Sequence, residues 1–179
     1  NLLIQTAVQI LREYGKKYLG GELGFTMVLH TWGQTMIEHP HLHFIVTGGA
    51  LVSTPYGYRW QAAKRKFLFD APTLSKDFRH LFCENLRNLS QTESLDTNAG
   101  LLNVAQLVET AEAKNWEVFI QPPIYGVDKL LEYLGRYVFR IAISNHRIVS
   151  VTHDTVTFTY YDNHDKSEIK PLKKMTLSS

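Results

Sequence analysis

Apolar positions along this chain recur every three to four residues in four stretches, the spacing that lines one face of an α-helix. The first stretch ends where Gly20 and Gly21 break the pattern, and the second begins after Pro72, with Thr73 or Ser75 as its candidate cap. The pattern predicts helices over residues 2–18, 72–89, 101–113 and 127–141. A polar stretch over residues 91–100 is expected to link the second helix to the third.

Runs rich in aromatic and β-branched residues lie between these helices and predict β-strands. Pro40 precedes the second run, Gly48 and Gly49 follow it, and Pro122 and Pro123 end the run before the last helix. The predicted strands cover residues 25–30, 41–46, 50–53, 58–60, 66–69, 116–121, 147–151 and 155–161, and the last two alternate like a β-hairpin. The basic tail over residues 166–179 has few large apolar groups, so we expect it to fray or to bind phosphate.

The composition of the chain sets the size and the class of the protein. A length of 179 residues with 44% hydrophobic content fits one core, so we expect a single domain over residues 1–179. A net charge of +2 and a pI of about 8.6 neither indicate nor exclude a nucleic-acid binder. Because the chain begins at Asn1, we expect a processed product or a piece of a longer protein.

One cysteine and the absence of long apolar runs narrow the cellular setting. Cys83 stands alone, which excludes an internal disulfide framework and a multi-cysteine zinc site within these residues. No run of 18 apolar residues and no secretion-signal pattern occur in the sequence. We therefore expect a soluble protein of a reducing compartment such as the cytoplasm, with no membrane partner.

A cluster of histidines is the densest chemistry in the chain. His41 and His43 alternate on a predicted strand, so their imidazoles project from the same face. Two imidazoles and one further side chain can hold a metal ion and leave positions open for a substrate oxygen. The first candidate for the third ligand is His30, and the alternatives are Gln34, Glu38, His39 and His146. In the other interpretation, the alternating histidines face solvent or satisfy backbone groups.

Two tyrosines on the last predicted helix are candidate nucleophiles. Tyr133 and Tyr137 are four residues apart, so both phenols lie on one helix face about one turn apart. A tyrosine can attack a phosphodiester and keep the DNA end as a phosphotyrosine ester, which conserves the bond energy for rejoining. A divalent ion beside the phosphate would support this chemistry. Alternatively, the pair consists of ordinary packing or surface aromatics, since the chain has nine tyrosines.

Two groups of basic residues are candidates for DNA binding. Arg136 and Arg140 lie beside the tyrosines and are expected to bind phosphates, although Arg140 and Arg147 could equally form surface ion pairs. The second group lies close to Tyr58 and Trp60 in the sequence and consists of Lys64, Arg65 and Lys66. Cations interleaved with aromatic rings suit sequence-tolerant binding of single strands. A solvated turn is the alternative for this second group.

Several segments, in the same order, resemble one known family. His-Pro-His-Leu-His-Phe-Ile-Val-Thr-Gly-Gly-Ala-Leu over residues 39–51, preceded by His-Thr-Trp-Gly-Gln at 30–34, is similar to the HUH segment of bacterial two-tyrosine transposases of the insertion-sequence-ninety-one-like family. Tyr-Leu-Gly-Arg-Tyr at 133–137, followed by Arg-Ile-Ala-Ile-Ser-Asn-His-Arg at 140–147, is similar to the tyrosine motif of that family and the signature downstream of it. The resemblance covers most of the chain.

This resemblance implies a fold and an activity. It implies an α+β fold of the HUH endonuclease type, ferredoxin-like or palm-like, with a central antiparallel β-sheet flanked by helices and the nucleophile tyrosines on a helix. It implies His41 and His43 as metal ligands and Tyr133 and Tyr137 as nucleophiles. The implied activity is metal-dependent nicking and strand transfer of single-stranded DNA through a 5′-phosphotyrosine intermediate, in rolling-circle transposition.

The resemblance also implies a cofactor and partners. The cofactor is a divalent ion, Mg²⁺ or Mn²⁺, and the partner is single-stranded DNA at the transposon ends and the target. The protein would be a bacterial cytoplasmic one that associates with the nucleoid when it acts on DNA. The cysteine-rich zinc-binding region that precedes this core in family members is absent from these residues, since Cys83 is the single cysteine.

Three alternative functions share parts of this pattern. A plasmid replication initiator or relaxase would use the same metal and tyrosine chemistry. A catalytically idle DNA-binding module would use the basic residues alone. A hydrolytic enzyme could hold zinc with His30, His41 and His43, which would leave the tyrosine pair without a role. The sequence alone does not determine which of the two phenols attacks first.

Overall fold

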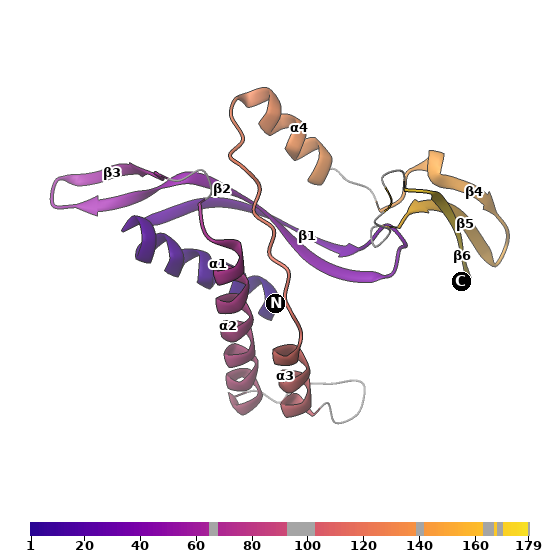
Figure 1. The fold of residues 1–179 in the computed structure, drawn as a ribbon, viewed down its shortest axis with the longest axis horizontal. Helices are drawn as coiled ribbons and strands as arrows, with labels where there is room; N and C mark the ends of the chain where they lie inside the picture. The colour runs from indigo at the N-terminus through magenta and orange to yellow at the C-terminus, as the bar shows by residue number, and fades with distance from the viewer. Residues whose placement is uncertain (65–67, 93–102, 139–141, 163–166, 168–169, 179) are drawn as a thin grey trace. The chain divides into compact units, whose positions relative to one another are not determined.

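The computed structural model describes residues 1–64, 68–92, 103–138, 142–162, 167 and 170–178, and these form two compact units (Figure 1). The first unit comprises residues 1–26 and 45–124, and the second comprises residues 27–44 and 125–179. Strands β1 (Glu22–Trp32) and β2 (Glu38–Thr54) contribute residues to both units.

Three helices pack in sequence order in the first unit. Helix α1 (Leu2–Tyr14) continues into a π-helical turn over Gly15–Leu19, and the chain then leaves the helix at Gly20, whose φ is 71°. Helix α2 (Ala71–Thr92) packs against α1, and α3 (Val104–Ala113) packs against α2. The buried residues of α1 follow the predicted spacing and are Thr6, Ala7, Ile10, Leu11 and Tyr14. The three predicted helices are confirmed in position, and residues 93–102 lie outside the described part of the chain.

Strand β2 and strand β3 (Gly57–Ala62) form an antiparallel hairpin in the first unit. The predicted strands at 50–53 and 58–60 are confirmed, but the glycines do not end the preceding strand, because β2 runs through them. Gly49 pairs with Ala62, and a Cβ at Gly49 would lie 2.5 Å from the Gln61 carbonyl oxygen. Glycine is therefore required here because β3 lies too close to the backbone of β2 for a side chain, and not because the chain turns.

A strand is predicted at residues 66–69, but the two described residues of this range do not form one. Leu68 and Phe69 form a bend, and residues 65–67 lie outside the described part of the chain. Phe69 is buried and its ring lies edge-on to Tyr14 at 5.0 Å, so the aromatic content that favoured a strand reflects packing against α1.

The prediction of a strand at residues 116–121 is wrong. The segment is extended, but within the described residues it pairs with no strand. Trp116 instead packs between helices, with its ring 5.3 Å from Phe78 and 5.0 Å from Phe82, and its Nε1 donates to the Ala111 carbonyl at 3.0 Å. Alternating burial thus indicates an extended chain with one covered side, and such a side can be covered by helices as well as by a sheet.

The second unit contains a three-stranded antiparallel sheet in the order β4-β5-β6. The predicted hairpin is confirmed as β4 (Ile148–Val151) and β5 (Thr155–Tyr161). The expectation that the tail frays is wrong, because Leu172–Ser178 forms strand β6 and pairs with β5 along its whole length. Met175 lies opposite the buried Phe158, which supplies the apolar contact that the basic composition of the tail concealed.

Helix α4 (Val127–Tyr137) also belongs to the second unit and begins after Gly126, whose φ is 89°. The helix predicted over 127–141 is confirmed as far as Tyr137, and residues 139–141 lie outside the described part of the chain. The predicted α+β class is confirmed. In place of one central antiparallel sheet, the strands of the described residues form two sheets, β1-β2-β3 and β4-β5-β6. No helix in the described ranges is long and apolar enough to cross a membrane.

Replacing Trp116 with alanine is expected to destabilise the protein by about 3 kcal/mol, because the change removes aromatic packing on α2 and a partly buried hydrogen bond to α3. Chemical denaturation followed by circular dichroism measures this loss. Phe119→Ala is the matched control, since Phe119 lies in the same segment with 83% of its surface exposed and should change stability by less than about 0.5 kcal/mol. Equal losses in both variants would contradict the packing role of Trp116.

Candidate metal and nucleophile site

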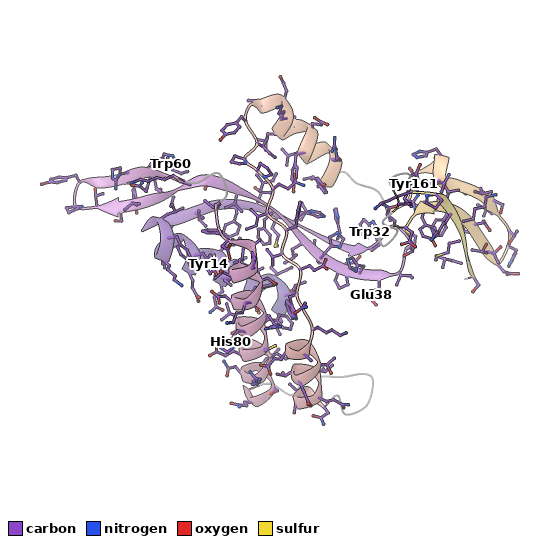
Figure 2. All side chains as sticks on the ribbon, viewed as in Figure 1. Tyr14, Trp32, Glu38, Trp60, His80 and Tyr161 are labelled. Carbon is purple, nitrogen blue, oxygen red and sulfur yellow. The ribbon has the colours of Figure 1, made fainter. Side chains whose placement is uncertain are left out.

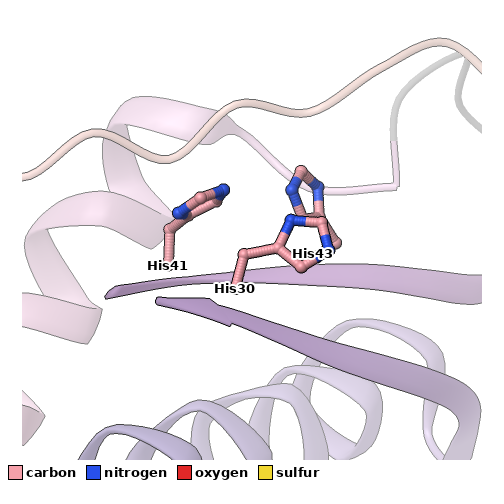
Figure 3. A group of neighbouring side chains, drawn as sticks. All are labelled: His30, His41 and His43. Atoms are coloured by element: carbon pink, nitrogen blue, oxygen red, sulfur yellow. The ribbon is translucent and has the colours of Figure 1, made fainter. Parts of the chain in front are cut away.

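Three histidines from two neighbouring strands converge in the second unit (Figure 3). His30 comes from β1, and His41 and His43 come from β2. One ring nitrogen from each lies within 4.8 Å of the others, and the ring centroids are 4.7 to 5.3 Å apart. His30 is buried and the other two are half-buried. The three imidazoles could therefore hold one metal ion.

Hydrogen bonds define which nitrogen of two of these rings is left for a metal. His30 Nε2 donates to the Tyr137 carbonyl at 2.7 Å, and His41 Nδ1 donates to the His39 carbonyl at 2.8 Å. A carbonyl oxygen only accepts, so these two nitrogens carry the ring protons of the neutral imidazoles. The lone pairs then lie on His30 Nδ1 and His41 Nε2. Anchoring of the opposite nitrogen is the usual way in which a protein orients a histidine ligand.

The other candidates for the third ligand have different surroundings. The side-chain oxygen of Gln34 accepts from the Tyr161 backbone N–H at 3.1 Å, and the nearest partner of His146 is the Ser144 hydroxyl. Glu38 and His39 are exposed, and neither belongs to the group of converging ligand atoms found among the described residues. The His39 ring lies 5.1 Å from the His41 ring, but of the sequence candidates within the described ranges only His30 joins His41 and His43 in the group of converging ligand atoms.

Trp32 is a neighbour of this site that sequence reasoning missed. Its ring stacks on His30 with a centroid distance of 5.4 Å and an interplanar angle of 24°. The signal was present in the sequence, because residues 30 and 32 alternate on β1 and so share one face of the strand. Trp32 therefore restricts the orientation of the His30 ring by direct ring contact.

The rings of the two candidate nucleophiles lie in a row that ends at the histidines, and each ring is tilted against the next. The rings of Tyr133 and Tyr137 are 4.4 Å apart, and the ring of Tyr137 is 4.5 Å from that of His43. Both tyrosines are half-buried. Burial and the neighbouring Tyr137 raise the pKa of the Tyr133 phenol above its ordinary value, because both disfavour the phenolate. Tyr137 is thus the phenol adjacent to the histidines, and Tyr133 follows it.

The basic candidates have separate surroundings. Arg136 is exposed and forms an ion pair with Glu132 one turn earlier on α4, a contact that contributes little to stability. Arg147 is structural, since it donates to the carbonyls of Thr159 and Gln34 at 2.8 and 2.6 Å. Lys64 is exposed in the first unit, and Arg65 and Arg140 lie outside the described residues. Phosphate binding by Arg136, Arg140, Lys64 and Arg65 stays a prediction.

This site combines a potential metal centre with a pair of phenols within one unit. Residues 24–179 match the model of the Y2_Tnp family, which is described as "Putative transposase". The chain therefore belongs to this transposase family, as its motifs indicated.

Two curated relatives are similar to the chain. It is 37% identical over 172 residues to "Putative transposase y4qJ" of Sinorhizobium fredii, a match covering 90% of this chain and 42% of the relative. It is 25% identical over 170 residues to "Transposase for insertion sequence element IS801" of Pseudomonas savastanoi pv. phaseolicola, covering 86% of this chain and 37% of the relative. The chain thus spans about two fifths of the length of these relatives. No solved structure is significantly similar to it.

Divalent-ion affinity should depend on the three histidines. We expect His30→Ala, His41→Ala and His43→Ala each to weaken Mn²⁺ binding by at least tenfold, since each removes one of three converging ligand atoms. Isothermal titration calorimetry measures the affinity, and thermal melts verify that each variant is folded. His39→Ala is the matched control, because the His39 ring lies 5.1 Å from the His41 ring without belonging to the group of converging ligand atoms, and the change keeps the backbone carbonyl that accepts from His41. A comparable loss in His39→Ala would count against the three-histidine site.

The raised pKa of Tyr133 predicts a late phenol ionisation. Phenolate absorbance is followed in alkaline titrations of the parent chain and of Tyr133→Phe, both without divalent ions. The difference between the two curves is the absorbance of Tyr133. It should develop at a higher pH than the absorbance of an ordinary tyrosine. The sign follows from burial, which favours the neutral phenol. Tyr56→Phe, which removes a fully exposed phenol, supplies the reference. A Tyr133 midpoint at or below the Tyr56 midpoint would contradict the burial argument.

Proposed function

We propose that residues 1–179 form one catalytic core that nicks and rejoins single-stranded DNA through a 5′-phosphotyrosine intermediate, in rolling-circle transposition. One observation carries the proposal. Tyr137 adjoins the histidine cluster twice, through its ring at 4.5 Å from His43 and through its carbonyl, which accepts from His30. A candidate nucleophile and candidate metal ligands thus belong to one site. The names of the curated relatives, both transposases, agree with this proposal.

The donor set fits a divalent ion. His30, His41 and His43 would hold it through one nitrogen each, and at two of them the opposite nitrogen already donates to a carbonyl. An ion bound there would offset the negative charge that develops on the scissile phosphate. Imidazole nitrogen suits Mn²⁺ better than Mg²⁺, which prefers oxygen ligands. Of the two predicted ions, we therefore propose Mn²⁺ as the one that supports activity better.

The order of the two tyrosines follows from their distance to the histidines. We propose that the Tyr137 phenol oxygen attacks phosphorus first. The bond from phosphorus to the 3′ oxygen breaks, the phenol proton is lost, and the leaving 3′ oxygen takes up a proton. The 5′ end is then held on Tyr137 as an ester, and attack by a 3′ hydroxyl reverses these bond changes without ATP.

Tyr133 is suited to a second transfer. Burial and the neighbouring Tyr137 raise the pKa of its phenol, so Tyr133 is harder to deprotonate than an ordinary tyrosine and is the less favoured first nucleophile. Because the rings are 4.4 Å apart, a second strand could be received beside the first. The proposed partners are single-stranded transposon ends and target DNA, with Arg136, Arg140, Lys64 and Arg65 as candidate phosphate contacts. The proposed setting is the bacterial cytoplasm at the nucleoid.

The test is formation of a covalent adduct with 3′-labelled single-stranded oligonucleotides that carry candidate element ends. With Mn²⁺, the parent chain should give a labelled band on denaturing gels. Tyr137→Phe and His41→Ala should each reduce this band by at least a hundredfold, and Tyr133→Phe should keep the first adduct but lose the transfer of a second strand. Tyr161→Phe, a half-exposed tyrosine on β5, is the control and should behave like the parent.

Each other outcome supports a different account. Loss of the first adduct in Tyr133→Phe but not in Tyr137→Phe would reverse the proposed order of attack. Cleavage without any adduct would favour the metal-dependent hydrolase. Tight binding without cleavage, at every ion tested, would favour a DNA-binding module that lacks catalysis.

A further inference from the structure

The β2–β3 hairpin carries an exposed aromatic face in the first unit, where Figure 2 labels Trp60. Tyr58 is 76% exposed and Trp60 is 52% exposed. Trp60 pairs with Leu51, and Tyr58 pairs with Ser53. Paired residues of an antiparallel ladder share a face, and residues two apart lie on the same side, so all four occupy one face. Exposed apolar surface of this kind usually marks an interaction site.

The aromatic face is held in place by the hairpin itself. A Cβ at Gly49 would lie 2.6 Å from Cζ2 of Trp60, so the indole rests against the bare backbone of the opposite strand. At the turn, the Thr54 hydroxyl donates to the Gly57 carbonyl at 2.9 Å and accepts from the Tyr56 N–H at 3.3 Å. A surface that is ordered before binding loses little conformational entropy when a ligand arrives.

The charge of this region selects an anionic ligand. Between Glu38 and Asp70 the sequence contains no acidic residue. The four lysines and arginines of this stretch are Arg59, Lys64, Arg65 and Lys66. Arg59 and Lys64 are exposed. A ligand that suits both flat rings and cations has flat unsaturated groups on a polyanionic chain, which describes unpaired nucleic acid.

We propose that the Tyr58–Trp60 face of the β2–β3 hairpin is a base-stacking platform for single-stranded DNA. Bases stack on Trp60 and Tyr58, and Lys64 contacts a phosphate of the same strand. Duplex DNA binds poorly there because its bases already stack on one another. The proposal deepens the proposed function by adding a substrate-binding surface that is distinct from the histidines and tyrosines of the candidate site.

The test measures equilibrium binding of a fluorescent oligothymidylate in the Tyr133→Phe/Tyr137→Phe double variant with a chelator present, so that cleavage cannot occur. Adding Tyr58→Ala or Trp60→Ala should weaken binding by roughly tenfold each, and Trp60→Phe should retain most of the affinity because it keeps a ring. Lys64→Ala should reduce the salt dependence of log affinity by about 0.7, the value for one single-strand phosphate contact. A duplex of the same length should bind at least about tenfold more weakly than the single strand.

Phe119→Ala is the matched control, since it removes another exposed aromatic ring from the same unit and should leave binding unchanged. Unchanged affinity in Trp60→Ala and Tyr58→Ala, equal losses in Phe119→Ala, or equal binding of duplex would overturn the platform. So would a change of oligomeric state in Trp60→Ala with unaltered DNA affinity, which would make the face a contact between copies of the chain.

The adduct assay separates this inference from the proposed function. Adducts that form equally well in the parent chain and in Trp60→Ala at subsaturating DNA would overturn the platform and leave the tyrosine chemistry intact. Ring-dependent binding in the double variant, with no adduct in the parent chain, would support the platform and count against the proposed function.

Discussion

The hydrogen bond from His30 to the backbone carbonyl of Tyr137 joins the two halves of the candidate site. Tyr137 is the last residue of α4, where helix carbonyls lack a partner within the helix. The buried imidazole supplies that partner, and its own protonated nitrogen is thereby defined. One contact thus satisfies the end of the helix, sets the tautomer of a candidate ligand and brings a candidate nucleophile beside the histidine strands.

This arrangement gives the candidate nucleophile Tyr137 a structural role within its unit. None of the residues of α4 is buried, and Val127 and Leu131 expose much of their surface. Burial of an apolar face is what normally holds a helix in position. Here the ring and carbonyl contacts of Tyr137 connect the helix to the histidines, and these contacts position α4 within its unit.

The errors of the sequence predictions share a physical cause. The extended segment at 116–121 and the tail at 172–178 both have the alternation of a strand in part, yet only the tail pairs with another strand. Alternation reports that one side of the chain is covered, and it contains no information on what covers it. Trp116 packs against a ring of α2, whereas Met175 lies opposite Phe158 in the paired strands of a sheet. Gly49 likewise marks a close approach to Trp60 and not the end of a strand.

Local periodicity accounts for what could be read from the chain alone. The spacing of two between His41 and His43, and of four between Tyr133 and Tyr137, places each pair on one face whatever the rest of the fold does. The identity of the third histidine, the proximity of Tyr137 rather than Tyr133 to the cluster, and the use of Arg147 to bind the carbonyls of Gln34 and Thr159 depend on contacts between residues up to 113 positions apart. Such contacts follow from strand pairing and side-chain packing, which no short stretch of sequence specifies.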